Sequence, residues 1–203
     1  IITDPPYGID MDMLDQTNQG QSGIDSVRAQ HDVKNNLQML GAFIPLAYES
    51  LREQGFLVMW CDYMNFRYLH DNAVEAGFKV QRWPIVWQKT GPCKNSAAGF
   101  NFTKRNEIAI VCRKGLATLA KTCSTNTIIA GPDELSDSAS HPFAKPYAVW
   151  EYLYEHLTIA GQSILDPFAG SGTAVISALR MNRSAFGCEI EDTHYNEMLN
   201  VVK

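Results

Sequence analysis

The chain has 203 residues, of which 45% are hydrophobic and 19% charged. This composition is typical of one globular domain and excludes disordered and collagen-like chains. No apolar run approaches the ~18 residues of a membrane span, so a soluble, cytoplasmic protein without membrane partners is expected. Five cysteines lack C-x-x-C or zinc-site spacing, which predicts reduced, structural thiols and no metal.

Charge is distributed unevenly along the chain. The formal net charge is −5, yet residues 79–121 carry nine Lys or Arg against one acid, so this segment is +8 and the rest of the chain is −13. An acidic body with one basic face can bind a polyanion on that side only.

The amino-terminal part predicts strands and helices around one long connection. Residues 1–4 are interpreted as the end of a buried strand, because Pro5 and Pro6 cannot continue a central ladder. Residues 8–34 show no sustained periodicity, which predicts a long loop that is either disordered or covers a functional site. Apolar spacing and glycine stops then predict a helix over 37–52, a strand over 56–61 and a helix over 63–76.

Two β-branched and aromatic runs, 79–88 and 107–112, predict an antiparallel hairpin joined by the polar loop 89–106. Most of the basic charge lies on this hairpin. The residues expected to contact nucleic acid are Lys89, Lys94, Lys104 and Arg105.

Strands and helices alternate in the carboxyl-terminal part, which predicts a doubly wound α/β fold with a mostly parallel sheet. The expected elements are helices at 147–159, 173–181 and 193–202, strands at 163–166 and 184–189, and a glycine turn at 168–172.

The glycine turn lies between a strand and a helix, in the sequence D-P-F-A-G-S-G-T over 166–173. Glycines there allow backbone to approach a ligand at the helix amino terminus, and Glu189 after the next strand can accept ribose hydroxyls. A nucleotide-like cofactor is therefore expected. Val175 replaces the third glycine of the dinucleotide fingerprint, and a plain strand-to-helix turn is the alternative.

The tetrapeptide Asp4-Pro5-Pro6-Tyr7 predicts chemistry on an amino group. The nitrogen of an aromatic amine is a poor nucleophile because its lone pair is delocalised into the ring. The Asp4 carboxylate and the Pro5 carbonyl can each accept one N–H, which favours a pyramidal nitrogen, and Tyr7 can stack on an extruded base. A structural turn with a core tyrosine is the alternative.

In this order, D-P-P-Y (4–7), H-P-x-x-K-P (141–146), D-P-F-x-G-S-G-T (166–173) and G-x-E (187–189) resemble the β-class DNA amino-methyltransferases, which use S-adenosylmethionine. The resemblance covers nearly the whole chain and implies a circularly permuted, Rossmann-like methyltransferase domain over 1–203. Its catalytic half would be about 1–115, its connecting segment 116–140 and its cofactor-binding half 141–203.

The resemblance also implies roles for individual residues. Asp4, Pro5, Pro6 and Tyr7 would bind the target amino group. Cofactor contacts would come from Asp166, Phe168, Gly170, Gly172, Thr173, Glu189, Lys145 and Pro146. The family's strand before D-P-P-Y and its sizeable recognition segment have no counterpart, so we expect a further amino-terminal segment before Ile1, or a homodimer that covers the exposed sheet edge.

Adenine-N6 methylation of DNA, in a restriction-modification or phage setting, is the first functional hypothesis. Cytosine-N4 methylation uses the same chemistry, and an RNA adenine methyltransferase or a non-catalytic nucleic-acid-binding subunit are further alternatives. Intact acceptors at Asp4 and glycines at Gly170 and Gly172 argue against the last of these.

Overall fold

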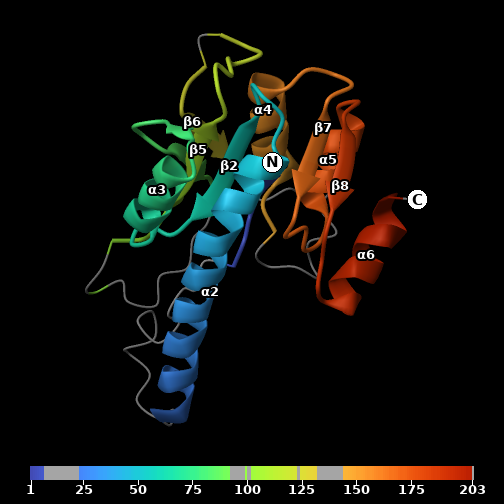
Figure 1. The fold of residues 1–203 in the computed structure, drawn as a ribbon. Coiled ribbons are helices and arrows are strands. Elements are labelled where there is room, and N and C mark those ends of the chain that lie inside the picture. Colours follow the sequence, from blue (N-terminus) through green and yellow to red (C-terminus); the bar gives the residue numbers. More distant parts are fainter. Residues whose placement is uncertain (7–22, 92–98, 100–101, 123, 132–143, 203) are drawn as a thin grey trace.

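The computed structural model describes residues 1–6, 23–91, 99, 102–122, 124–131 and 144–202 (Figure 1). In chain order, the elements are β1 (Ile2–Thr3), α2 (Gly23–Ser50), β2 (Phe56–Cys61), α3 (Phe66–Glu75), β3 (Lys79–Val80), β4 (Ile85–Lys89), β5 (Asn106–Arg113), β6 (Thr127–Ala130), α4 (Tyr147–Leu157), β7 (Ser163–Asp166), α5 (Thr173–Arg180), β8 (Ser184–Gly187) and α6 (Asp192–Val202).

The main sheet has the order β1-β2-β5-β4-β6, with β3 also paired to β5. β1 is parallel to β2 and β4 is parallel to β6, whereas β5 is antiparallel to each of its neighbours. Only β5 therefore runs against the other strands of this sheet. β7 and β8 form a parallel pair beside β1, where Thr3 bonds to Asp166. The predicted mostly parallel α/β fold with one antiparallel hairpin is confirmed.

Helices pack against both faces of the sheet. Successive side chains of β2 point to opposite faces, and because they are apolar, each face has to be covered. Val58 and Trp60 point into a core shared with α4 and α5. Leu57 and Met59 point into a second core shared with α2 and α3. All four side chains are fully buried, so β2 is the centre of a doubly wound arrangement.

The structure corrects the prediction of a loop over 8–34. α2 begins at Gly23, and its amino-terminal half extends away from the sheet (Figure 1). The segment between Ile24 and Gln38 contains neither Gly nor Pro, so nothing interrupts a helix whose carboxyl-terminal half is anchored in the core. Residues 8–22 lie outside the described part of the chain.

Two strand predictions also change. The strand expected over 79–88 is divided into β3 and β4, because Pro84 cannot donate to a ladder. β6 lies inside the segment 116–140, where no strand was predicted, and extends the sheet beyond β4.

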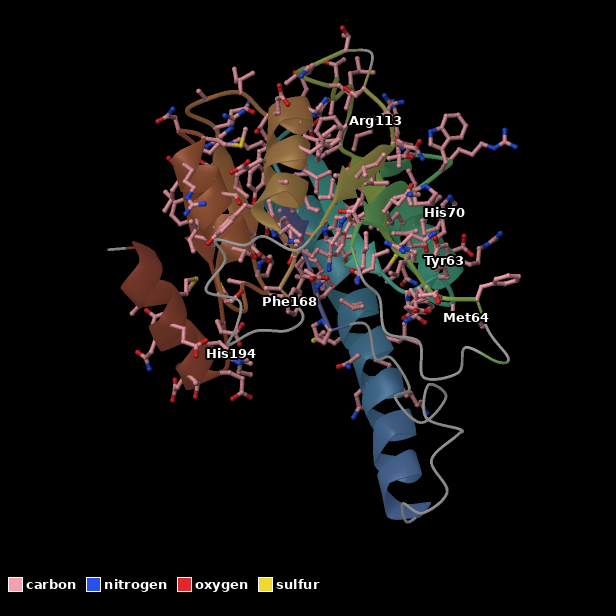
Figure 2. All side chains as sticks on the ribbon, turned by 180° about the vertical axis from the view of Figure 1, so that it is seen from behind. Tyr63, Met64, His70, Arg113, Phe168 and His194 are labelled. Carbon is pink, nitrogen blue, oxygen red and sulfur yellow. The ribbon has the colours of Figure 1, made fainter. Side chains whose placement is uncertain are left out.

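The carboxyl ends of the parallel strands lie together at one edge of the molecule. Figure 2 shows Phe168, Tyr63 and Met64 at this edge and Arg113 at the opposite end. Asp4 follows β1, Asp62 follows β2, and Asp166 ends β7. In open α/β sheets, ligands bind at this carboxyl edge.

Candidate active site

Asp166 is the buried end of β7, with 2% of its surface exposed. Its Oδ1 accepts a hydrogen bond from Thr3 Oγ1 at 2.5 Å and another from the Phe168 backbone N–H at 3.1 Å. Burial raises the pKa of Asp166 to about 7 despite these donors. The carboxyl group thus fixes the glycine turn to the end of β1, from which Asp4 follows.

The two glycines of the turn serve different purposes. Gly172 has φ +79° and precedes α5, and a Cβ there would collide with Met198 Cγ at 2.4 Å. Gly170 has φ +51°, and a Cβ there would meet nothing within 4 Å. Gly172 is therefore required by packing, whereas Gly170 leaves open space into which a ligand can approach the backbone.

Glu189 is bound to this turn from the end of β8. Its Oε2 accepts the Gly170 N–H at 2.7 Å, and its Oε1 accepts the backbone N–H groups of Ile190 and Glu191, both at 2.9 Å. The carboxylate is therefore held in a fixed orientation beside the open side of Gly170. The sequence did not predict this tie between the two expected cofactor residues.

Phe168 is held from the other side by α2. Its ring makes an edge-to-face contact with Phe43, with centroids 5.6 Å apart and planes at 79°. Thr173, the first residue of α5, is buried, and Pro146 precedes the first residue of α4. Of the expected cofactor residues, Asp166, Phe168, Gly170, Gly172 and Thr173 thus belong to the turn or adjoin it in the chain, and Glu189 is hydrogen-bonded to it.

Lys145 instead reaches the Asp4-Pro5-Pro6-Tyr7 tetrapeptide. Its Nζ contacts Asp4 Oδ2 and lies 3.1 Å from Glu107 Oε2. Glu107 also pairs with Lys89 Nζ at 2.5 Å. A chain of alternating charges therefore runs from Asp4 at the end of β1 to Lys89 at the end of β4. Glu107 was not expected as a site residue, because in the sequence it is only the single acid of the basic segment 79–121.

Trp60 and Cys61 form the end of β2 beneath this ion-pair chain. Lys145 Nζ lies 4.9 Å from the centroid of the fully buried Trp60 ring. Burial raises the pKa of the Cys61 thiol to about 12, so the thiol stays protonated near neutral pH. A protonated thiol is a poor nucleophile, so this cysteine is unsuited to covalent catalysis.

The residues expected to contact nucleic acid are partly engaged within the protein. Lys89 pairs with Glu107 and lies over the Trp87 ring at 4.8 Å. Arg105 donates to the carbonyls of Lys89 and Gly91. Lys104 lies 3.6 Å from Asp62, and its side chain is about half exposed, so it is the most available of the three. Lys94 lies outside the described residues.

Apolar and aromatic side chains are exposed beside the same edge. Met64 is 88% exposed, Tyr63 is 49% exposed, and Phe102 is fully exposed. The Tyr63 hydroxyl donates to Asn106 at 3.2 Å, which ties this turn to the hairpin. Surface aromatic and apolar side chains of this kind can stack on or wedge between nucleic-acid bases.

Of the Asp4-Pro5-Pro6-Tyr7 tetrapeptide, the structure describes three residues. Pro5 is buried and Pro6 is exposed, while Asp4 is held by Lys145. Tyr7 and residues 141–143 of the H-P-x-x-K-P motif lie outside the described residues. Within the described part, no group of three His, Cys, Asp or Glu side chains is arranged to bind a metal, and no helix has the length and apolarity to cross a membrane.

A glycine turn and an acid at the carboxyl edge of a doubly wound sheet, next to an Asp-Pro-Pro turn, are features of the class of α/β proteins that bind a nucleotide-like cofactor at this edge. Residues 1–200 match the family model N6_N4_Mtase, described as DNA methylase, and the chain belongs to that family. The resemblance to S-adenosylmethionine-dependent DNA amino-methyltransferases is confirmed, and the enzyme is a DNA methyltransferase of this group.

Bacterial relatives match over most of their length. The chain is 27% identical over 218 residues to the type II methyltransferase M2.DpnII of Streptococcus pneumoniae, covering 94% of this chain and 77% of the relative. It is 26% identical over 200 residues to the putative methylase YubD of Escherichia coli strain K12, covering 96% and 77%.

Solved structures share the fold. The M1.HpyAVI–SAM complex superposes with a TM-score of 0.75 at 23% identity, covering 100% of this chain and 87% of the other. The cytosine-N4-specific PvuII DNA methyltransferase gives a TM-score of 0.74 at 16% identity, covering 98% and 77%.

Proposed function

We propose that the chain transfers a methyl group from S-adenosylmethionine to N6 of adenine in DNA. The observation that carries this proposal is the position of Asp4, which follows β1 directly beside the glycine turn that follows β7. One edge of the sheet thereby brings together a carboxylate that can accept a hydrogen bond from an amino group and a glycine turn against whose backbone a cofactor can lie.

The residues around the turn fit a nucleoside cofactor. Gly170 leaves open space where its Cβ would be, and the carboxylate of Glu189 is oriented beside it. In this proposal Glu189 accepts ribose hydroxyls, and Asp166, Phe168 and Gly170 line the pocket. When bound, S-adenosylmethionine supplies an electrophilic methyl group on a sulfonium.

Asp4 and the Pro5 carbonyl act on the other reactant. Each accepts one N–H of the amino group, so that the nitrogen lone pair is available for the new N–C bond as the S–C bond breaks. The nitrogen then loses a proton to water, and no covalent enzyme intermediate is formed. The protonated thiol of Cys61 near the site supports this direct route.

DNA would approach over the hairpin and the turn after β2. Lys104 and Arg105 would contact phosphates, and the exposed Tyr63, Met64 and Phe102 would lie against unstacked bases. A target base must leave the duplex to reach Asp4.

Cytosine-N4 is the second candidate, since the same acceptors suit both amines and a cytosine-N4-specific methyltransferase shares the fold. Incubating the protein with DNA and labelled S-adenosylmethionine, followed by mass spectrometry of the nucleosides, distinguishes the two. We expect N6-methyl-2′-deoxyadenosine. N4-methyl-2′-deoxycytidine alone would support the second candidate, and no methylated nucleoside would contradict both.

A further inference from the structure

Lys145 is a buried cation between two carboxylates. Its side chain is 2% exposed, and its ammonium contacts Asp4 and lies 3.1 Å from Glu107. Burying an ammonium is costly unless it is paired and hydrogen-bonded, so these partners determine where the side chain lies. A role in binding cofactor does not account for this arrangement.

The topology explains why one lysine can reach both acids. β2 lies between β1 and β5 in the sheet, and Cys61 at the end of β2 is in register with Ile108 of β5. Glu107 precedes Ile108 and is therefore at the same carboxyl edge as Asp4, one strand away on the other side of β2. The Lys145 ammonium thus bridges β1 and β5 across the end of β2.

We propose that Lys145 is a positioning residue for methyl transfer, which holds the Asp4 carboxylate in place for the target amino group, and that Glu107 holds Lys145. This inference rests on the proposed function of Asp4. Glu107 is in turn fixed by Lys89 at 2.5 Å, so the orientation of the acceptor depends on β4 and β5 as well as β1.

The charges around Asp4 determine the effect of removing Lys145. Among the described residues, Asp4 is near Lys145 from the segment before α4, Glu107 from β5, Asp166 from β7 and the Cys61 thiol from β2. Without the ammonium, Asp4 loses this ion-pair partner while the carboxylates of Glu107 and Asp166 stay nearby, and Glu107 is still paired with Lys89. Repulsion between the carboxylates then moves the Asp4 side chain from the position in which it accepts an N–H of the amino group.

The test compares wild type with Lys145→Met, Glu107→Gln and the double variant. Single-turnover methyl transfer is measured at saturating S-adenosylmethionine, and S-adenosylmethionine binding is measured by calorimetry. We expect Lys145→Met to lower the rate at saturating cofactor about tenfold or more, with cofactor affinity changed by less than about threefold.

Glu107→Gln alone should lower the rate less, because Lys145 keeps its contact with Asp4. In the double variant the loss should be smaller than in Lys145→Met, because one repelling carboxylate has been removed. Lys121→Gln breaks an exposed pair with Glu155 at 2.6 Å and is the matched control, expected to behave as wild type.

Two results would overturn the inference. One is a Lys145→Met variant that loses cofactor binding but keeps the wild-type rate at saturating cofactor, which would assign Lys145 to the cofactor. The other is an NMR signal of the Asp4 carboxylate carbon that is the same in wild type and Lys145→Met, which would show that Lys145 does not hold this group. The NMR comparison requires no turnover, so it tests the inference separately from the proposed function, which an inactive wild type would contradict.

Discussion

At the scale of single residues, the glycine turn contains a structural glycine and a ligand-facing one. Gly172 is confined by Met198 whether or not a cofactor binds, while Gly170 has open space beside it. Substitutions at the two positions should therefore have different consequences, although the sequence presents them as equivalent members of one motif.

Gly170→Ala should weaken S-adenosylmethionine binding with a small loss of stability from its positive φ. Gly172→Ala should lower the melting temperature, because its Cβ would need Met198 to move. Calorimetric titration and thermal unfolding of both variants test this. Equal effects of the two variants on cofactor affinity and on stability would contradict the distinction.

Asp166 should make stability depend on pH. Its pKa in the folded protein is raised from 3.8 to about 7, so between these values the folded state binds more protons than the unfolded chain. The free energy of unfolding should therefore fall as the pH rises from about 4 to about 7, by at most about 4 kcal/mol. Asp166→Asn, which retains an acceptor for Thr3 and Phe168, should flatten this dependence.

Urea unfolding of wild type and Asp166→Asn at pH 5 and pH 8 measures the difference. The same change of unfolding free energy with pH in both proteins would show that Asp166 is not its source.

At the scale of elements, the basic segment is divided by the direction of its strands. β4 ends and β5 begins at the candidate site, so Lys89, Lys104 and Arg105 lie at that edge. Lys79 and Arg113, which face each other in the register of β3 and β5, lie at the opposite end. A single positive segment in the sequence is thus two separate positive regions in the fold.

Lys104→Gln should therefore lower the slope of log binding constant against log salt by about 0.9 on duplex DNA, since one phosphate contact is lost. Lys79→Gln removes the same charge at the far edge and should leave the slope unchanged. Binding of both variants to a duplex, followed by fluorescence anisotropy from low to moderate salt, makes the comparison. Equal slopes for Lys104→Gln and wild type would place DNA elsewhere.

At the scale of the whole molecule, the fold was predictable where local signals and burial agree. β2 and β7 have the expected bounds, because continuous apolar runs end at acids and glycine turns. The start of α2 and the strand β6 were missed, since their sequences lack a distinctive apolar period and depend on tertiary packing.

The candidate site was predictable as motifs but not as contacts. The motifs indicated Asp4 and the glycine turn, because the residue order of each motif is rarely needed for structural reasons alone. The Asp4–Lys145–Glu107 cluster joins residues up to 141 positions apart, and only the order of strands brings them together. No local spacing carries that information.

The central claim is that Asp4 accepts an N–H of the target amino group during methyl transfer. The most direct measurement is single-turnover methylation of duplex DNA by Asp4→Ala at saturating S-adenosylmethionine, with cofactor affinity measured in parallel. Loss of one transition-state hydrogen-bond partner predicts a rate lower by about 10²–10³-fold, with cofactor affinity much less affected. A variant that methylates DNA at close to the wild-type rate would contradict the account.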